Sequence, residues 1–264
     1  MLHGVIIVPV ADLRSHAKPD AERLSQAIFG TPIIIEDTRR NFSLVKLPEG
    51  YKGWCRSPHI DQVAFARWQS YVKKPKHRIK VETAKVYHDQ TPEAEPYRLY
   101  FGTEVALLKH GGKTRFTLPN GYRGQLSPSV LAEPLGKKLK AVASTDIIKT
   151  AKKFLGVPYL WGGITPAGYD CSGLVQKVYG FHGIKLPRDS SRQRKEGIKI
   201  SRDSIERGDL LFFPGHVAIA INSKDFIHAS ASRGMVVIES LNPDVAKYRK
   251  DLDSKFEFAR RLPL

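Results

Sequence analysis

Hydrophobic and polar positions follow two different patterns along this chain, and the change between them falls near residue 140. In the first half, β-branched and aromatic residues gather in brief runs, each bounded by Gly, Pro or polar residues. Such runs predict short strands joined by tight turns. The clearest of them cover residues 32–35, 42–45, 105–108 and 114–118. The first half is therefore expected to be all-β.

The second half begins with helical periodicity. Ile147, Ile148, Ala151 and Phe154 recur at helical spacing, and a further amphipathic segment starts near Asp170. The runs that follow are short, apolar and rich in β-branched residues, as buried strands are. They cover residues 210–213, 217–221, 226–229 and 236–238. Helices followed by strands predict an α+β domain in this half.

The first half also repeats itself. Leu-Pro-Glu-Gly-Tyr-Lys-Gly at 47–53 recurs as Leu-Pro-Asn-Gly-Tyr-Arg-Gly at 118–124, and Phe-Gly-Thr at 29–31 recurs at 101–103. Two independent matches at nearly the same offset indicate a tandem repeat. We therefore predict two small barrels, residues 1–72 and 80–135, followed by a third unit over residues 141–264.

Composition fits a folded protein of two or three units. The chain has 264 residues, 41% of them hydrophobic and 26% charged, which argues against general disorder. Its formal net charge of +17 would attract polyanions. The basic residues are nevertheless dispersed, apart from short clusters at 73–80 and 137–140, and we recognise no nucleic-acid-binding motif. We expect a solvated basic surface and no nucleic-acid partner.

The apolar stretch at residues 5–10 contains Pro9 and lacks a preceding basic region. It fits neither a signal peptide nor a spanning helix, so we expect a strand there and no membrane span. A cytoplasmic location follows as an expectation, with secretion as the alternative if a signal peptide was removed. Cys55 and Cys171 are the only cysteines in the sequence. In a reducing compartment they are expected to be two free thiols.

Cys171 is the stronger candidate for chemistry. Asp170 is a good N-cap, which would put Cys171 in the first turn of the amphipathic segment. Unpaired N–H groups and the positive end of the helix dipole would there lower the pKa of a thiol, and the same N–H groups could hold an oxyanion. The alternative is an inert core cysteine. Cys55, which follows Trp54 in a β-repeat, has no comparable setting.

A thiol nucleophile needs a base within hydrogen-bond reach and a third group that orients the base. His216 stands at the head of an apolar strand, and His228 interrupts the apolar run 226–229. An odd number of residues in the turn between the two strands would place His228 opposite Ala218, on the face that carries His216. An even number would separate the histidines. The sequence leaves this register open.

Residues 141–264 resemble the NlpC family of cell-wall cysteine peptidases, whose fold is similar to a compact papain core. The motifs that carry the resemblance occur in the family's order: Tyr159-Leu160-Trp161-Gly162-Gly163, Asp170-Cys171-Ser172-Gly173, Pro187-Arg188-Asp189-Ser190, Gly208-Asp209-Leu210, Gly215-His216-Val217 and Ile227-His228-Ala229. The resemblance implies that Cys171 attacks the amide, His216 activates the thiol and protonates the leaving amine, and His228 orients the imidazole. No metal or cofactor is implied; a zinc site is the minor alternative.

The two repeats resemble bacterial SH3-like domains. The expected fold class is therefore an α+β, papain-like NlpC catalytic domain preceded by two small all-β SH3-like barrels. Family members with this layout look like γ-D-glutamyl-L-diamino-acid endopeptidases of the dipeptidyl-peptidase VI type. The resemblance implies murein stem peptides with a free N-terminal L-Ala as partners. These would be cut between γ-D-glutamate and the diamino acid during recycling of cell-wall peptides.

The resemblance also implies a substrate site. Its residues would be Tyr51, Tyr159, Asp170, Ser172, Asp189 and Ser190. Asp170 or Asp189 would face the ammonium of the substrate, and Tyr51 would line the cleft from the first repeat. Asp189 and Ser190 could instead belong to an ordinary polar loop. Glu22 lies in the region of an acidic partner, but gaps in the match leave its role open.

Three alternative functions stay open at this point. A secreted hydrolase would act on polymeric peptidoglycan, with the repeats as wall-binding modules. A non-catalytic protein would use the basic repeats to bind an anionic polymer, although the intact Cys171, His216 and His228 argue against this. An amidase or acyltransferase would use the same thiol, base and oxyanion site. The preferred diamino acid and the oligomeric state are not predicted.

Overall fold

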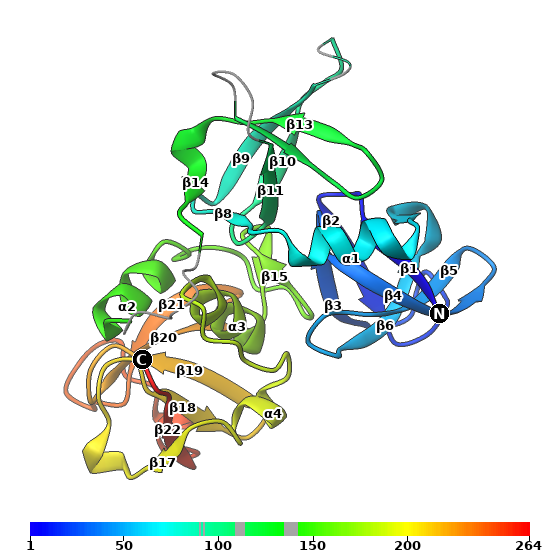
Figure 1. Cartoon of the computed structure of the whole chain (residues 1–264). Coiled ribbons are helices and arrows are strands. Elements are labelled where there is room, and N and C mark those ends of the chain that lie inside the picture. Colours follow the sequence, from blue (N-terminus) through cyan, green and yellow to red (C-terminus); the bar gives the residue numbers. More distant parts are fainter. Residues whose placement is uncertain (90, 92, 109–113, 135–141) are drawn as a thin grey trace. The chain divides into compact units, whose positions relative to one another are not determined.

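The computed structural model describes residues 1–89, 91, 93–108, 114–134 and 142–264 (Figure 1). The chain divides into two compact units, Met1–Gly136 and Lys137–Leu264. The basic cluster at 137–140 and the expected boundaries at residues 135 and 141 lie outside the described residues.

The first unit contains two seven-stranded sheets. Their strands are β1 (Leu2–Ile6), β2 (Val10–Arg14), β3 (Arg23–Ile28), β4 (Pro32–Arg39), β5 (Phe42–Lys46), β6 (Lys52–Arg56) and β7 (Ile60–Gln62), then β8 (His77–Ile79), β9 (Thr83–His88), β10 (Tyr97–Tyr100), β11 (Glu104–Leu108), β12 (Arg115–Thr117), β13 (Arg123–Gln125) and β14 (Leu131–Ala132). The orders are β3-β2-β6-β5-β4-β1-β7 and β10-β9-β13-β12-β11-β8-β14, so the two sheets correspond strand for strand. A 3-10 turn, η1 (Ser57–His59) or η2 (Pro128–Val130), precedes the last strand of each.

The repeated sequence motifs form matching turns in the two sheets. Gly50 and Gly121 have φ of 85° and 95°, a left-handed conformation that glycine adopts without steric cost. Each sits in a turn closed by a leucine amide that donates to the carbonyl of the following tyrosine, at 2.8 Å in the first sheet and 3.0 Å in the second. Gly30 and Gly102 likewise share a φ of 77°. The sequence repeat therefore reflects a repeated fold.

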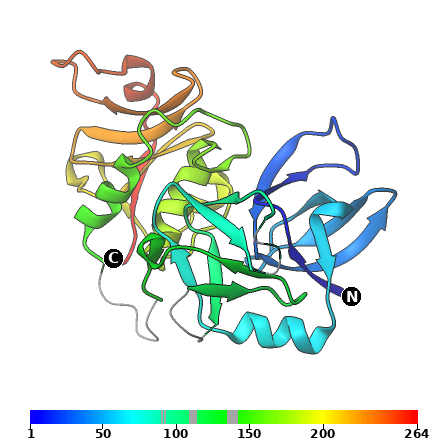
Figure 2. The same ribbon diagram turned by 90° about the horizontal axis from the view of Figure 1, so that it is seen from above.

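The helix α1 (Phe65–Lys73) connects the two sheets of this unit (Figure 2). The Tyr71 hydroxyl on this helix donates to the Gly30 carbonyl at 2.9 Å. Phe29, from the first sheet, packs edge-on against Phe116 and Tyr122 of the second. The apolar core of the second sheet thus includes Val5 and Phe29 from the first repeat, while the rest of the first sheet has a core of its own.

The second unit packs helices against a six-stranded antiparallel sheet. Its helices are α2 (Ser144–Lys152), α3 (Cys171–Phe181), α4 (Ser190–Gln193) and α5 (Lys250–Asp253), with the 3-10 turn η3 (Arg202–Ser204). The sheet has the order β17 (Ile198–Ile200), β22 (Phe258–Arg261), β18 (Leu210–Phe213), β19 (His216–Ala220), β20 (Asp225–Ser230), β21 (Met235–Ser240). A small hairpin, β15 (Ile164–Thr165) and β16 (Gly168–Tyr169), leads into α3, which packs on β19 and β20.

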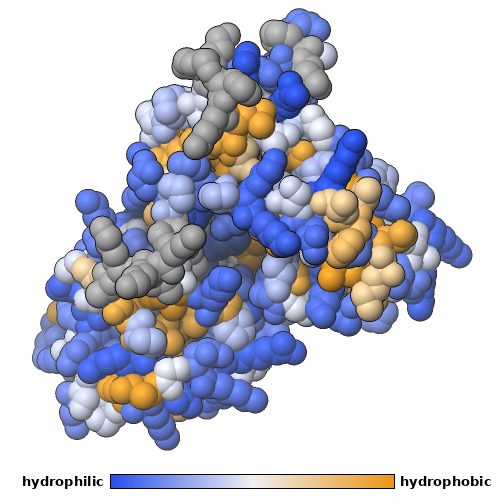
Figure 3. All heavy atoms as spheres, in the orientation of Figure 1, coloured by the Kyte–Doolittle hydropathy of each residue, from blue (hydrophilic) through white to orange (hydrophobic). Residues whose placement is uncertain are grey.

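These observations confirm the expected fold class of an α+β unit preceded by all-β sheets. In the described part of the chain, no helix is long and apolar enough to cross a membrane. Hydrophilic residues predominate on the face shown in Figure 3, with the hydrophobic ones in small separate areas.

Candidate active site

The N-terminus of α3 has Cys171 as its first residue. The Asp170 side chain accepts a hydrogen bond from the Gly173 amide at 2.7 Å, so Asp170 is the N-cap, as its position in the sequence predicted. The Cys171 side chain is half-buried. Its sulfur accepts hydrogen bonds from the backbone amides of Val217 and Ser172. Because Val217 directly follows His216, the sulfur lies beside the start of β19.

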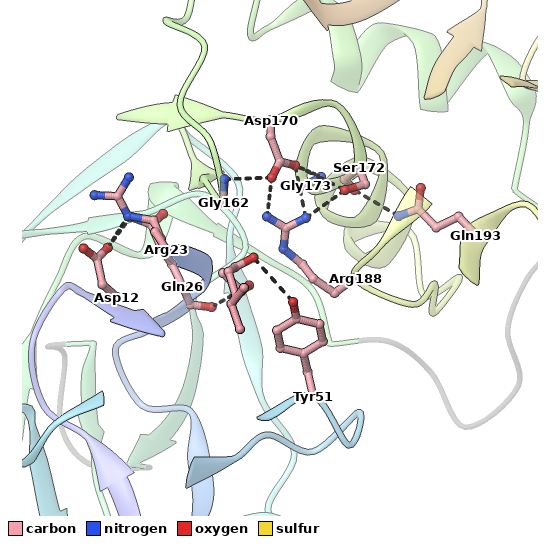
Figure 4. Close-up of polar contacts among 12 residues, drawn as sticks. Asp12, Arg23, Gln26, Tyr51, Gly162, Asp170, Ser172, Gly173, Arg188 and Gln193 are labelled. Atoms are coloured by element: carbon pink, nitrogen blue, oxygen red, sulfur yellow. Dashed lines mark hydrogen bonds and ion pairs between the residues drawn. The ribbon is translucent and has the colours of Figure 1, made fainter. Parts of the chain in front are cut away.

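A buried ion pair fixes the loop that precedes this helix (Figure 4). Arg188 binds both carboxylate oxygens of Asp170, with Nη1 3.1 Å from Oδ1 and Nη2 2.5 Å from Oδ2. The same carboxylate accepts hydrogen bonds from the Gly162 amide at 2.9 Å and the Ser172 hydroxyl at 3.3 Å. Arg188 also donates to the Ser172 hydroxyl at 2.8 Å. The sequence motif Pro187-Arg188-Asp189-Ser190 contains Arg188 but does not indicate this role.

The register of β19 and β20 settles where the two histidines lie. Ile219 pairs with Ile227, so an odd number of residues separates the paired positions, and the same register sets Ala218 opposite His228. His228 therefore shares a face with His216. Nε2 of His216 lies 2.7 Å from Nδ1 of His228. This odd spacing is the case for which the sequence predicted that the two histidines lie side by side.

The line of hydrogen-bonded side chains continues from His228 on β20 to Glu239 on β21. Nε2 of His228 lies 2.8 Å from Oε2 of Glu239, and both residues are buried. Nε of Arg233 lies 2.8 Å from Oε1 of Glu239, and Nη1 of Arg249 lies 2.5 Å from Oε2. Glu239 is not among the site residues predicted from the sequence. The one indication there is a carboxylate placed directly after the apolar run 236–238, where a charged residue needs a partner.

Burial raises the pKa of the Cys171 thiol to about 11, and the charge of Asp170 adds to the rise. The amides of Val217 and Ser172 and the guanidinium of Arg188 act in the opposite direction without outweighing it. The expectation of a lowered thiol pKa at this helix N-terminus is therefore wrong, because desolvation exceeds the stabilisation by N–H groups. At neutral pH Cys171 is a thiol, and a base must remove its proton when it reacts.

Burial lowers the pKa of His216 to about 3, with His228 and Arg249 contributing and Glu239 opposing. The pKa of His228 is also lowered, again chiefly by burial. Burial alone would raise the pKa of Glu239, but hydrogen bonds from His228, Arg249 and Arg233 bring it down to about 2. At neutral pH the site therefore holds a thiol, two neutral imidazoles and a carboxylate.

The other residues expected to bind substrate in this unit lie on the elements around Cys171. Tyr159 is half-buried, and burial raises the pKa of its hydroxyl to about 12, with Cys171 and Asp170 adding to the rise. Asp189 and Ser190 are half-buried at the start of α4, which packs against α3. Substrate binding by these residues stays a prediction.

Three residues considered for the site or for its chemistry, Tyr51, Glu22 and Cys55, belong to the first unit. The Tyr51 hydroxyl donates to the Leu24 carbonyl at 3.5 Å, and the ring packs against the core of its own sheet. A place for Tyr51 in the site stays a prediction, and the role of Glu22 stays open. Cys55 is fully buried, and burial raises the pKa of its thiol to about 12. It has no histidine partner among its described hydrogen bonds.

Sequence comparisons match both parts of the chain to known proteins. The profile of the NlpC/P60 family matches residues 156–252, and that of the bacterial dipeptidyl-peptidase SH3 domain matches residues 13–60. A protein of Lysinibacillus sphaericus named dipeptidyl-peptidase 6 is 29% identical over 95% of this chain and 96% of its own length. A γ-D-glutamyl-L-lysine dipeptidyl-peptidase of Bacillus cereus is 28% identical over 83% of this chain and 70% of its own.

Two further comparisons bear on family and fold. A probable endopeptidase of Haemophilus influenzae is 33% identical over 46% of this chain and 73% of its own length. The crystal structure of an NlpC/P60 family protein from Bacillus cereus superposes with a TM-score of 0.88 and 24% identity, covering 99% of this chain and 100% of that one. The motifs around Cys171, His216 and His228 thus lie within a matching sequence and a matching fold, and the chain belongs to the NlpC/P60 family.

Proposed function

We propose that this chain is a cysteine endopeptidase that hydrolyses the bond between γ-D-glutamate and a diamino acid in murein peptides with a free N-terminal L-Ala. Cys171 is the nucleophile, His216 the base and His228 the group that orients the base. One observation carries the proposal. The Cys171 sulfur is hydrogen-bonded to the amide that follows His216, and the far ring nitrogen of His216 is held by His228. The relatives named for this activity support the substrate class.

The chemistry follows from the protonation states of the site. With Nε2 engaged by His228, Nδ1 is the nitrogen of His216 that can take the proton of the thiol as sulfur attacks the carbonyl carbon. His216 then gives this proton to the leaving amine. Water, deprotonated by the same nitrogen, attacks the thioester and releases the acid and the free thiol.

Backbone N–H groups at the start of α3 would hold the oxyanion. The amides of Gly173 and Leu174 donate to Asp170, through its side chain and its carbonyl respectively, and that of Ser172 donates to the sulfur. We therefore assign the oxyanion to the amide of Cys171 itself, in the first turn, where the helix dipole also favours negative charge.

Recognition of the free terminus is assigned to the elements around the thiol. Tyr159, Asp170, Ser172, Asp189 and Ser190 would bind the L-Ala-γ-D-Glu portion. We favour Asp189 for the ammonium, because five donors already occupy the oxygens of Asp170. Tyr51 would wall the cleft, from a barrel spanning residues 1–72. A second barrel at 80–135 and the peptidase domain at 141–264 would complete the chain.

A substrate that must be short and carry a free amine suits recycling of released peptides in the cytoplasm better than digestion of the polymeric wall. The test is mass spectrometry of L-Ala-γ-D-Glu-diamino-acid peptide after incubation with the protein, beside an N-acetylated copy and intact sacculi. Release of L-Ala-γ-D-Glu from the free peptide alone is the expected result. Equal cleavage of the acetylated copy would contradict recognition of the free terminus, and cleavage of sacculi would favour a wall hydrolase.

A further inference from the structure

We propose that Glu239, held between Arg233 and Arg249, is a positioning residue that sets the proton positions of His228 and His216. In this arrangement Nδ1 of His216 carries no proton and is ready to accept one from the thiol. The inference rests on the proposed role of His216 as the base. Glu239 contacts His228 and lies one strand further from Cys171, so its influence on the proton position of His216 passes through the hydrogen bonds of His228.

The sheet brings these side chains into one row across three strands. His228 on β20 pairs directly with Val237 on β21, so Glu239, two residues further along, lies on the same face and diagonal to His228. His216 occupies the corresponding diagonal position on β19, beside Ala218. The row is therefore a consequence of strand register and not of loop conformation.

The order of protons along the row follows from the carboxylate at its end. An ionised carboxylate only accepts hydrogen bonds, so Nε2 of His228 must donate to Glu239 at 2.8 Å. A neutral imidazole carries one proton, which leaves Nδ1 of His228 as an acceptor. Nε2 of His216 must then donate to it at 2.7 Å. Nδ1 of His216 is left with its lone pair.

Two arginines keep the Glu239 carboxylate ionised, so that it can only accept hydrogen bonds. Arg233 donates to Oε1 of Glu239 and Arg249 to Oε2, while the Glu239 side chain is only 4% exposed. Arg249 is itself held by Asp251, through Nε to Oδ1 and Nη2 to Oδ2, each at 2.8 Å. A protonated carboxyl would have to point its O–H at His228 or at one of these cations. The arrangement therefore excludes the donor state, which would reverse both imidazoles.

Reversal would matter because it puts a proton on the wrong nitrogen. His228 would then donate from Nδ1 to Nε2 of His216, and Nδ1 of His216 would carry a proton and be unable to accept one from Cys171. In a serine protease, whose fold is unrelated, an imidazole held in the wrong tautomer lowers kcat by about 10⁴-fold. Glu239 thus bears on the rate of reaction and not on the affinity for substrate.

The first test uses the unmodified protein. Two-bond ¹H–¹⁵N spectra of protein labelled at histidine report which ring nitrogen carries the proton, and loss of signals in His216→Ala and His228→Ala assigns the two rings. We expect both rings to carry the proton on Nε2 at pH 7. A proton on Nδ1 of either ring would overturn the inference, whether or not the protein cleaves any peptide. Failure of the proposed function would show separately, as a lack of cleavage by wild type.

The second test is kinetic. Glu239→Leu removes the acceptor and is expected to lower kcat at least about a hundredfold with little change in KM. Glu239→Gln keeps an oxygen that can accept from His228 and should restore most of that loss together with the wild-type tautomers. Glu206→Gln is the matched control, because the Glu206 side chain is 70% exposed beside Arg261. A folded Glu239→Leu variant with the activity of the control would overturn the inference, and so would a Gln variant no better than Leu.

Discussion

The guanidinium of Arg188 donates hydrogen bonds to both carboxylate oxygens of Asp170, the N-cap of the helix that begins with Cys171. The two side chains are almost fully buried, with exposed fractions of 2% for Arg188 and 10% for Asp170. The pair joins the segment before α4 to the N-cap of α3, and through the Gly162 amide it also holds the loop before the hairpin. The position of the thiol therefore depends on this buried ion pair.

Removal of Arg188 should destabilise the second unit strongly. Arg188→Met leaves the Asp170 charge buried with only neutral donors, and loss of one partner of a buried pair costs about 3 kcal/mol or more in the free energy of unfolding. Urea unfolding of the variant measures this. Arg192→Met, at an exposed position in the same segment, is the control and should change the free energy by less than about 0.5 kcal/mol. Equal effects of the two substitutions would show that the buried pair does not have this role.

A single methyl group at Gly173 should displace the nucleophile. A Cβ at this position would lie 2.1 Å from the Gly163 carbonyl oxygen, so the start of α3 would have to move, and Cys171 with it. We expect Gly173→Ala to lose most of its activity and about 1–3 kcal/mol of stability. Peptide cleavage and urea unfolding check both effects.

Gly180 on the same helix provides the matched control. A Cβ there meets nothing within 4 Å, and alanine favours a helix by up to about 1 kcal/mol over glycine. Gly180→Ala should therefore be active and as stable as wild type or more so. If Gly173→Ala behaved like Gly180→Ala, the close approach of the helix to Gly163 would not be what fixes the nucleophile.

Acid should destabilise the fold through His216. Its pKa is about 3 in the folded protein against 6.5 for a free imidazole, so the unfolded chain binds a proton that the folded one does not. The contribution of neutral His216 to the free energy of unfolding is fully present above pH 6.5. It is lost as the pH falls from there towards 3, at up to about 1.4 kcal/mol per pH unit for one proton. Glu239, with its pKa of about 2, adds a loss of the same sign below pH 4.5.

Unfolding measured in urea at several pH values between 7.5 and 4.5 tests this dependence. The slope should be shallower in His216→Ala than in wild type, since the titrating group is gone. An unchanged slope would mean that His216 is not held neutral by burial.

Local sequence was enough to predict the parts of the site that depend on neighbouring residues. Asp170 as N-cap and Cys171 in the first turn follow from a few consecutive positions. The adjacency of His216 and His228 depended on the parity of a turn, which composition does not determine. Glu239 reaches the site only through the pairing of β20 with β21, so its role required the register of both strands.

The expectation of a lowered pKa for the Cys171 thiol is wrong for a similar reason, since it depends on contacts that only the fold creates. The helix N-terminus that favours a thiolate is visible in the sequence, but the burial that raises the pKa of Cys171 arises only once the fold packs α3 against β19. In the first unit, by contrast, the sequence repeat predicted a repeated fold correctly, because the same residues close the same turns at Gly50 and Gly121.

The most direct test of the central claim compares wild type, Cys171→Ala and Cys55→Ala for release of L-Ala-γ-D-Glu from the free peptide, measured by mass spectrometry. Cys55 is the control because it is the other thiol of the chain, fully buried in the first unit. We predict that Cys55→Ala releases the dipeptide and that Cys171→Ala, still folded by circular dichroism, releases none. Release by Cys171→Ala at the wild-type rate would contradict the assignment of Cys171 as the nucleophile.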